Sequence, residues 1–290
     1  MTVMLLGATG MLGNAVLREF ESFSGGLIAT SRTGKIEGLS KAVTQVAFDA
    51  KSGDLGFLLG DMQKGDYLIN CIGVIKSEID EASTESKDNA TAINAVFPQN
   101  LAEVSESKGL RIIQIATDCA FSGKTGHYSE SSHHDAEDHY GLTKSAGEVV
   151  SDSMMHLRVS IIGPETRGHK SLYDWVALQP FGAKITGYTN HLWNGIPAKH
   201  FARISRAIIE SDLFVPGTQH IIPKDEVTKA QLVRLIAAHT VRQDLTIADG
   251  MASEAIDRTL TTNNPGFNSR LWQAAGYLQP PTIAELVAEI

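Results

Sequence analysis

The sequence of 290 residues predicts an α/β fold, a doubly wound parallel sheet with a smaller C-terminal lobe. Up to about residue 165, short apolar runs alternate with helical stripes, as in successive βαβ units. Beyond that point glycines and tryptophans interrupt the pattern, which favours an irregular lobe. We therefore expect one domain over residues 1–165, completed by a returning strand and helix from about 190–225, and a lobe formed mainly by residues 166–290.

The first predicted strand leads into a glycine-rich turn. The apolar run Val3–Leu6 is followed by three glycines spaced three residues apart and then by a helical stripe. Such glycines allow a tight turn and let a pyrophosphate approach the backbone at a helix N-terminus, which attracts negative charge. The pattern predicts a dinucleotide site, the alternative being a glycine-rich turn without a ligand. The residues expected at the dinucleotide are Gly7, Thr9, Gly10, Met11, Leu12 and Gly13.

The second and third predicted strands bear on the choice of cofactor. The second strand, Leu27–Ser31, ends at Arg32. An acidic residue usually follows this strand in sites that hold the ribose 2′-hydroxyl of NAD, whereas an arginine suits a 2′-phosphate. Ser31 and Arg32 therefore favour NADP(H) over NAD(H), with a surface arginine as the alternative. The third strand, Val43–Phe48, ends at Asp49, which is placed to reach the adenine.

The next two strands end at the edge where open α/β sheets bind ligands. The fourth spans Tyr67–Cys71, and the fifth spans Arg111–Ala116, so that Thr117 falls at this edge. Cofactor contacts expected after the fourth strand are Cys71, Ile72 and Gly73. Between these strands, Pro98 is expected to kink or break a helix that starts near Asn89.

A tyrosine and a lysine lie four residues apart at Tyr140 and Lys144, on one face of a predicted helix. A nearby ammonium favours the phenolate and is expected to lower the tyrosine pKa from about 10 toward ~7, which makes the phenol a usable acid. Alone, the spacing is equally compatible with a core tyrosine and a solvated lysine. Together with the glycine turn and Thr117, it predicts a catalytic group. A sixth strand, Leu157–Ile162, follows.

The loop from Ser122 to His139 contains four histidines and two aspartates. A metal site is one interpretation. Because these donors have no evident fixed scaffold, we favour a solvated loop that covers the substrate, and we expect no metal.

The C-terminal lobe offers groups that suit a sugar or a base. Trp193 has a flat aromatic face, and Asn194 has a donor and an acceptor for hydroxyls, although a core role for Trp193 is the alternative. Arg258 and Arg270 are candidates for a substrate diphosphate, with surface ion pairing as the alternative. Helical patterns cover His200–Ile209, Val227–Val241, Pro265–Tyr277 and Thr282–Ile290.

Composition limits the classes of partner. The formal net charge of −8 argues against nucleic acid or an anionic membrane. No apolar run approaches the ~20 residues that cross a membrane, and two cysteines are too few for a disulfide framework. We expect a cytoplasmic protein. The sequence does not decide whether the protein forms a homodimer, because a helix that packs on a second copy has the same apolar pattern as one that packs on the core.

These motifs together resemble the extended short-chain dehydrogenases/reductases. More closely, Ile115–Gly123, Tyr128–Glu130 and Tyr140–Glu148 are similar to the corresponding segments of dTDP-4-dehydrorhamnose reductase-like nucleotide-sugar reductases. The resemblance runs through most of the chain and is most specific from Ile115 to Gly163. It implies a Rossmann-type NADP-binding domain.

The resemblance also implies roles for single residues. The hydroxyls of Thr117 and Tyr140 hold the C4 carbonyl of the sugar, Lys144 binds the nicotinamide ribose, and NADPH delivers hydride to carbon. The substrate contacts implied or expected are Thr117, Asp118, Cys119, Trp193, Asn194 and Arg258.

Two positions depart from the family pattern. Cys119 stands where rhamnose-pathway reductases usually carry a tyrosine, and Ser122 stands where an aspartate is common, so the exact sugar is open. In the related 4,6-dehydratases a glutamate follows Thr-Asp, and Cys119 cannot replace that acid at neutral pH. This argues against a dehydratase.

The expected function is NADPH-dependent reduction of the 4-keto group of a dTDP- or UDP-linked deoxysugar, in cell-surface polysaccharide or glycoside biosynthesis. Two alternatives remain: a nucleotide-sugar epimerase that retains NAD, and a non-catalytic NADP-binding regulatory protein.

Overall fold

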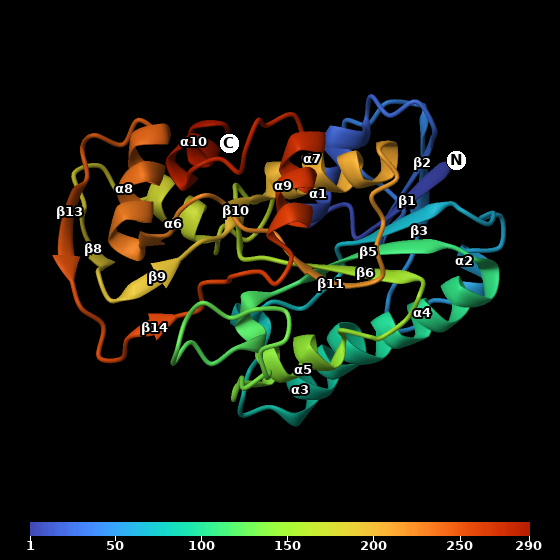
Figure 1. Cartoon of the computed structure of the whole chain (residues 1–290), viewed down its shortest axis with the longest axis horizontal. Coiled ribbons are helices and arrows are strands. Elements are labelled where there is room, and N and C mark those ends of the chain that lie inside the picture. Colours follow the sequence, from blue (N-terminus) through green and yellow to red (C-terminus); the bar gives the residue numbers. More distant parts are fainter.

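A parallel sheet of seven strands forms the centre of the computed structural model, which describes residues 1–290 (Figure 1). Its order is β11-β6-β5-β4-β1-β2-β3, and chain order reverses between β1 and β4. The predicted α/β fold class is confirmed. The strands are β1 (Thr2–Leu6), β2 (Gly26–Ser31), β3 (Val43–Ala47), β4 (Tyr67–Asn70), β5 (Arg111–Ala116), β6 (Met154–Arg158) and β11 (Gly217–His220).

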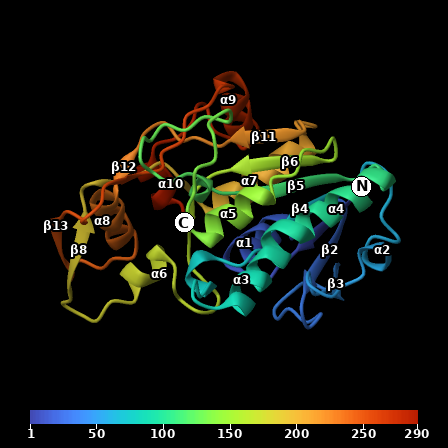
Figure 2. The ribbon, with the colours of Figure 1, turned by 90° about the horizontal axis from the view of Figure 1, so that it is seen from below.

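Alternate side chains of the strands supply two cores on opposite faces of the sheet. In β1, Val3 and Leu5 belong to the larger core, and Met4 and Leu6 belong to the smaller one. Helices α1 (Met11–Phe20), α7 (Ala198–Glu210) and α9 (Pro265–Ala274) cover the larger core. Helices α3 (Thr84–Thr91), α4 (Phe97–Lys108) and α5 (His139–Ala146) lie on the other face, and Figure 2 views the molecule from that side. The short helix α2 (Leu55–Leu58) packs near α4.

The prediction of one strand over Leu157–Ile162 is wrong. The strand β6 starts earlier and ends at Arg158, opposite Ala116, the last residue of β5. Beyond that point β6 has no partner, and Ile161–Ile162 (β7) instead pairs with β10 (Ile196–Pro197). The returning segment of the chain then adds α7, which packs against α1, and β11, which joins the sheet beside β6.

A π-helical turn, Ala92–Val96, joins α3 to α4 without a break in the helical backbone, and Pro98 follows this turn directly, in the first turn of α4. The Asn94 amide bonds both the N–H and the carbonyl of Val74, at 2.9 and 3.0 Å. A Cβ on Gly147 would lie 2.0 Å from the Asn94 carbonyl oxygen. Glycine at this position therefore lets the end of α5 pack directly on the π-helical turn.

The lobe stands beside the carboxyl edge of the sheet, on the left in Figure 1. The hydrophobic core of the lobe contains Ile185, Trp193, Leu232 and Ile283, which come from segments far apart in the chain. Its elements are α6 (Leu172–Ala177), β8 (Lys184–Tyr188), β9 (His191–Trp193), β12 (Val227–Thr228), α8 (Lys229–His239), β13 (Thr246–Gly250), β14 (Ile256–Asp257) and α10 (Ile283–Ala288). No helix in the chain is both long enough and apolar enough to span a membrane.

Candidate functional site

A cavity of about 610 Å³ opens at the carboxyl edge of the sheet, between the sheet and the lobe. The reversal of strand order between β1 and β4 makes this edge the expected ligand site of an open α/β sheet. Four groups of predicted residues line the cavity: the glycine turn, Arg32 after β2, the residues after β4, and those after β5 with α5. Their members are Thr9, Gly10, Met11, Leu12, Arg32, Cys71, Ile72, Gly73, Thr117, Asp118, Cys119, Tyr140 and Lys144.

The glycines of the turn have distinct tasks. Gly7 has a φ of +80°, which favours glycine, and its N–H donates to Thr30 Oγ1 at 3.1 Å. A Cβ on Gly13 would lie 2.0 Å from the Gly7 carbonyl oxygen, so Gly13 lets α1 pack on the turn. At Gly10 the nearest atom would be 3.9 Å away. The backbone at Gly10 is therefore open to a ligand at the N-terminus of α1, and the turn fits a pyrophosphate.

Arg32 connects the main cavity to a second hollow of about 200 Å³, which Asp49 also lines. The hollow lies at the ends of β2 and β3, where an adenosine is expected. Ser31 is buried and lines neither space; its hydroxyl faces the Lys35 carbonyl oxygen at 3.5 Å. Asp49 Oδ1 accepts from the Lys51 N–H at 2.8 Å.

Helix α5 brings Tyr140 toward the turn that begins at Thr117. A Cβ on Gly141 would lie 2.3 Å from the Cys119 carbonyl oxygen, so only glycine permits this approach. The Asp138 carboxylate caps α5 through the Gly141 N–H at 2.9 Å. Thr117 Oγ1 accepts from the Cys119 N–H at 3.1 Å and donates to Asp118 Oδ1 at 3.2 Å.

The pKa values of Tyr140 and Lys144 differ from the prediction. Lys144 is buried, its Nζ donates to the Ile115 carbonyl oxygen at 3.1 Å, and burial lowers its pKa. Burial also raises the pKa of the Tyr140 phenol, and hydrogen bonding to Thr117 opposes this only in part. The prediction that Lys144 lowers the Tyr140 pKa is therefore wrong for this arrangement. Tyr140 is a protonated phenol at neutral pH, as a proton donor must be.

Both cavity cysteines are neutral thiols at neutral pH. Burial raises the pKa of Cys119 to about 12 and raises that of Cys71 further. Neither is a thiolate nucleophile.

The family model described as the RmlD substrate binding domain matches residues 1–289. The chain belongs to this family. Among curated relatives, a probable low-salt glycan biosynthesis reductase of Haloferax volcanii, Agl14, is 25% identical over 267 residues, which cover 89% of this chain and 86% of that protein. The methionine adenosyltransferase 2 subunit beta of Xenopus tropicalis is 30% identical over 149 residues, or 50% of this chain and 41% of that protein.

Solved structures share the fold of this RmlD-family chain. A dTDP-4-dehydrorhamnose reductase from Bacillus anthracis in complex with NADP matches with a TM-score of 0.72 and 18% identity, over 99% of this chain and 97% of that one. A UDP-glucuronic acid 4-epimerase from Bacillus cereus in complex with NAD matches with a TM-score of 0.73 and 14% identity, over 99% and 94%. The fold alone therefore does not separate a reductase from an epimerase.

Three residues predicted to contact substrate in this RmlD-family chain differ in their placement. Trp193 is buried, yet it lines the cavity. Asn194 does not line it, because its amide bonds the N–H and the carbonyl of Leu260 at 2.9 and 2.7 Å. Arg258 also lies outside the lining, and its Nε donates to the Phe121 carbonyl oxygen at 2.7 Å.

Sequence reasoning missed a charged segment of the wall just after β7. Its side chains include Glu165, Thr166, Arg167 and Lys170. Thr166 Oγ1 donates to the Thr9 carbonyl oxygen at 3.1 Å, which fastens this segment to the glycine turn. The sequence feature that could have identified this segment is its position directly after a strand that ends at the ligand-binding edge of the sheet. Lys229, the first residue of α8, is a further missed cation of the wall.

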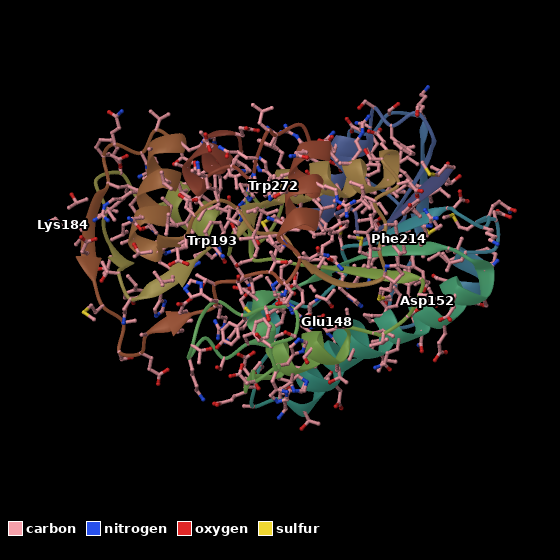
Figure 3. All side chains as sticks on the ribbon, viewed as in Figure 1. Glu148, Asp152, Lys184, Trp193, Phe214 and Trp272 are labelled. Atoms are coloured by element: carbon pink, nitrogen blue, oxygen red, sulfur yellow. The ribbon has the colours of Figure 1, made fainter.

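The histidine-rich loop takes part in a buried hydrogen-bond network. No group of three or more His, Cys, Asp or Glu side chains in the structure is arranged to hold a metal ion. The fully buried Arg158 forms an ion pair with Glu148, near the end of α5 in Figure 3, and donates to His134 Nε2 at 2.7 Å. His134 Nδ1 then donates to Ser145 Oγ at 2.6 Å. The loop is thereby fastened to the segment that carries Tyr140.

The same guanidinium donates to His220 Nε2 at 2.8 Å. His220 Nδ1 donates in turn to the Thr261 carbonyl oxygen at 2.6 Å. This arrangement requires a neutral imidazole with its proton on Nδ1. Burial, and then the charge of Arg158, lower the His220 pKa to about 4, although Glu130 opposes the shift.

Proposed function

We propose that the protein is an NADPH-dependent reductase of the 4-keto group of a nucleotide-linked sugar, dTDP- or UDP-linked and, as the sequence predicts, a deoxysugar. One observation carries the proposal: Thr117, Tyr140 and Lys144 line the same cavity as the glycine turn and Arg32. A hydroxyl pair, a buried ammonium and a dinucleotide cradle thus share one space. Membership of the RmlD family and the Haloferax reductase support this activity and a place in glycan biosynthesis.

NADPH, when bound, supplies the hydride that reduces the carbonyl carbon. The open backbone at Gly10 would hold its pyrophosphate, and Arg32 would hold its 2′-phosphate. The solved relative that contains NADP is in keeping with this choice.

Residues of this chain polarise the substrate and move the proton. Thr117 has one hydroxyl proton, now donated to Asp118, which it can turn toward a carbonyl oxygen. Tyr140, protonated at neutral pH, transfers its phenolic proton to the oxygen as negative charge develops there. Lys144 donates to the Ile115 carbonyl oxygen and lines the cavity, where its ammonium would bind the nicotinamide ribose. Arg167 and Lys170 add positive charge for diphosphate groups near the glycine turn.

The test is the oxidation of NADPH by the purified protein with dTDP- and UDP-linked 4-keto-6-deoxy sugars. Tyr140→Phe should lose at least ~10²-fold in kcat, since general acid catalysis contributes about that factor, and should keep its affinity for NADPH. Tyr188→Phe, at an exposed tyrosine outside the cavity, is the matched control and should keep full activity. Unchanged turnover in Tyr140→Phe would refute the assignment.

The same assay separates the two alternatives. An epimerase would convert sugars with no net consumption of NADPH. A regulatory protein would bind NADPH without turnover on any sugar, and the resemblance to the beta subunit of methionine adenosyltransferase 2 keeps this alternative under consideration. The proton donor Tyr140 favours catalysis, because a pure binding protein has no use for it.

A further inference from the structure

Lys229 is a cation of the cavity wall that has no anionic partner. It is the first residue of α8, and its Nζ lies 5.4 Å from the centroid of the Trp193 ring. No carboxylate oxygen lies within 4.0 Å of this ammonium, and it donates no hydrogen bond to another protein group. The ammonium thus rests on an aromatic face and lines the cavity. Figure 3 labels Trp193 where the lobe meets the sheet.

This position is electrostatically unfavourable without a ligand. A positive charge at the first position of α8 opposes the positive end of the helix dipole. The Thr228 hydroxyl and the Gln231 amide already form the capping box of α8. Burial lowers the pKa of Lys229, and Arg258 repels it further, whereas Asp118 only partly offsets these effects. The Trp193 indole Nε1 is also buried without an acceptor, which leaves a second donor unmatched nearby. A bound anion would relieve the cost at the ammonium.

The cations of the cavity divide between two regions. Arg167 and Lys170 belong to the segment that Thr166 fastens to the glycine turn, which suits diphosphate groups. Lys229 instead directly follows β12, in the small sheet β12-β9-β14, and the Asp257 N–H of β14 donates to the Gly123 carbonyl oxygen at 2.8 Å, close after the turn that starts at Thr117. Under the proposed function, Thr117 meets the reacting carbonyl of the sugar. The unpaired ammonium therefore lies at the sugar end of the cavity.

We propose that Lys229, held on the face of Trp193, forms an anion subsite beside the reacting carbon, and that it selects a sugar bearing a carboxylate, as in a nucleotide-linked uronic acid. This inference rests on the proposed function and names a substrate class for it, in which a carboxylate at C6 takes the place of the deoxysugar methyl group expected from the sequence. A charge-assisted hydrogen bond from the ammonium to the carboxylate gives the selectivity. A sugar with a neutral group at that carbon leaves the half-buried cation unpaired and binds less well.

The test compares two stable ligands that differ only at C6, UDP-glucuronic acid and UDP-glucose. Their dissociation constants are measured by calorimetry in the presence of NADP⁺, for wild type, Lys229→Met and Lys229→Arg. Wild type should prefer the acid by at least ~10-fold, because a hydrogen bond to a charged group contributes about that factor. Lys229→Met should abolish the preference, and Lys229→Arg should restore most of it. Lys184→Met is the matched control, at an exposed lysine outside the cavity, and should keep the preference.

Each other outcome overturns the inference in a distinct way. An equal loss of affinity for both sugars in Lys229→Met would assign the cation to the diphosphate. Unchanged affinities would show that no anion binds there. Equal binding of both sugars by wild type, with turnover of 4-keto-6-deoxy sugars intact, would refute the inference and leave the proposed reductase standing. If neither nucleotide sugar binds while NADP⁺ does, both the inference and the proposed substrate class fail.

Discussion

Acid should destabilise this protein well above the pH at which its carboxylates titrate, because its buried histidines must stay neutral, and two of them have a pKa of about 4 in the folded state. His220 accepts from Arg158 and donates to Thr261. His200 is fully buried, its Nδ1 has no partner, and burial lowers its pKa to about 4, although Glu289 at 3.4 Å opposes the shift. The perturbation is a change from pH 7.5 to pH 5.0.

The sign follows from proton binding. An unfolded histidine has a pKa of about 6.5, and the folded values are about 4, so between these values the unfolded state binds more protons. Stability is complete above about pH 6.5 and falls as the pH drops toward 4. At pH 5 each histidine contributes a loss of about 2 kcal/mol, and the two together about 4 kcal/mol. This is a large part of the 5–15 kcal/mol that is usual for domains.

Urea denaturation followed by circular dichroism at pH 7.5, 6.0 and 5.0 measures the effect. In His220→Asn, one titrating group is gone, so the loss between pH 7.5 and 5.0 should shrink by about 2 kcal/mol, even though the variant starts less stable. His133→Asn, at an exposed histidine of the same loop as His134, should keep the full loss. A free energy of unfolding that is constant from pH 7.5 to 5.0, or equal losses in wild type and His220→Asn, would refute the reasoning.

Two substitutions test how the cavity is built. Arg32→Ser should raise the Kd for NADPH by roughly 10- to 100-fold, because a charge-assisted contact to the 2′-phosphate is lost. The Kd for NADH should stay unchanged. Fluorescence titration measures both constants, and an equal change for the two cofactors would contradict the assignment. Gly141→Ala should lower kcat by about 10²-fold with little change in NADPH affinity, because a Cβ would lie 2.3 Å from the Cys119 carbonyl oxygen and move Tyr140 away from Thr117. Wild-type turnover in Gly141→Ala would count against that account of the site.

The first and last residues of a strand were predictable where the strand's own sequence determines them. The apolar run Arg111–Ala116 is β5 to the residue, and Val3–Leu6 lies within β1. The end of β6 was not predictable from its own residues, because β6 ends where its partner β5 ends, at the pair Ala116 and Arg158. The pairing of β8 with β13 joins segments some 60 residues apart, and no local pattern carries that information.

The site was predictable where it depends on position along the chain. Residues directly after β1, β4 and β5 must meet at one edge of a parallel sheet, and Gly10, Cys71 and Thr117 do line one cavity. Side-chain direction in the lobe was not predictable, because it depends on which neighbours satisfy each polar group. The Asn194 amide bonds Leu260 and does not face the cavity. Lys229 lines the cavity, although nothing in the sequence pattern of its helix distinguishes it from a lysine exposed to solvent.

The order of pairing in the sheet has a consequence for the nascent chain. Strand β6 pairs with β5 on one side, but its other partner, β11, begins only at Gly217, about 60 residues after Arg158. At 5–20 residues per second, translation needs roughly 3–12 s to supply it. Throughout that interval β6 is an open edge that could pair with another chain. Arg158, the last residue of β6, places a charge on this edge and discourages such pairing until β11, His134 and His220 enclose it.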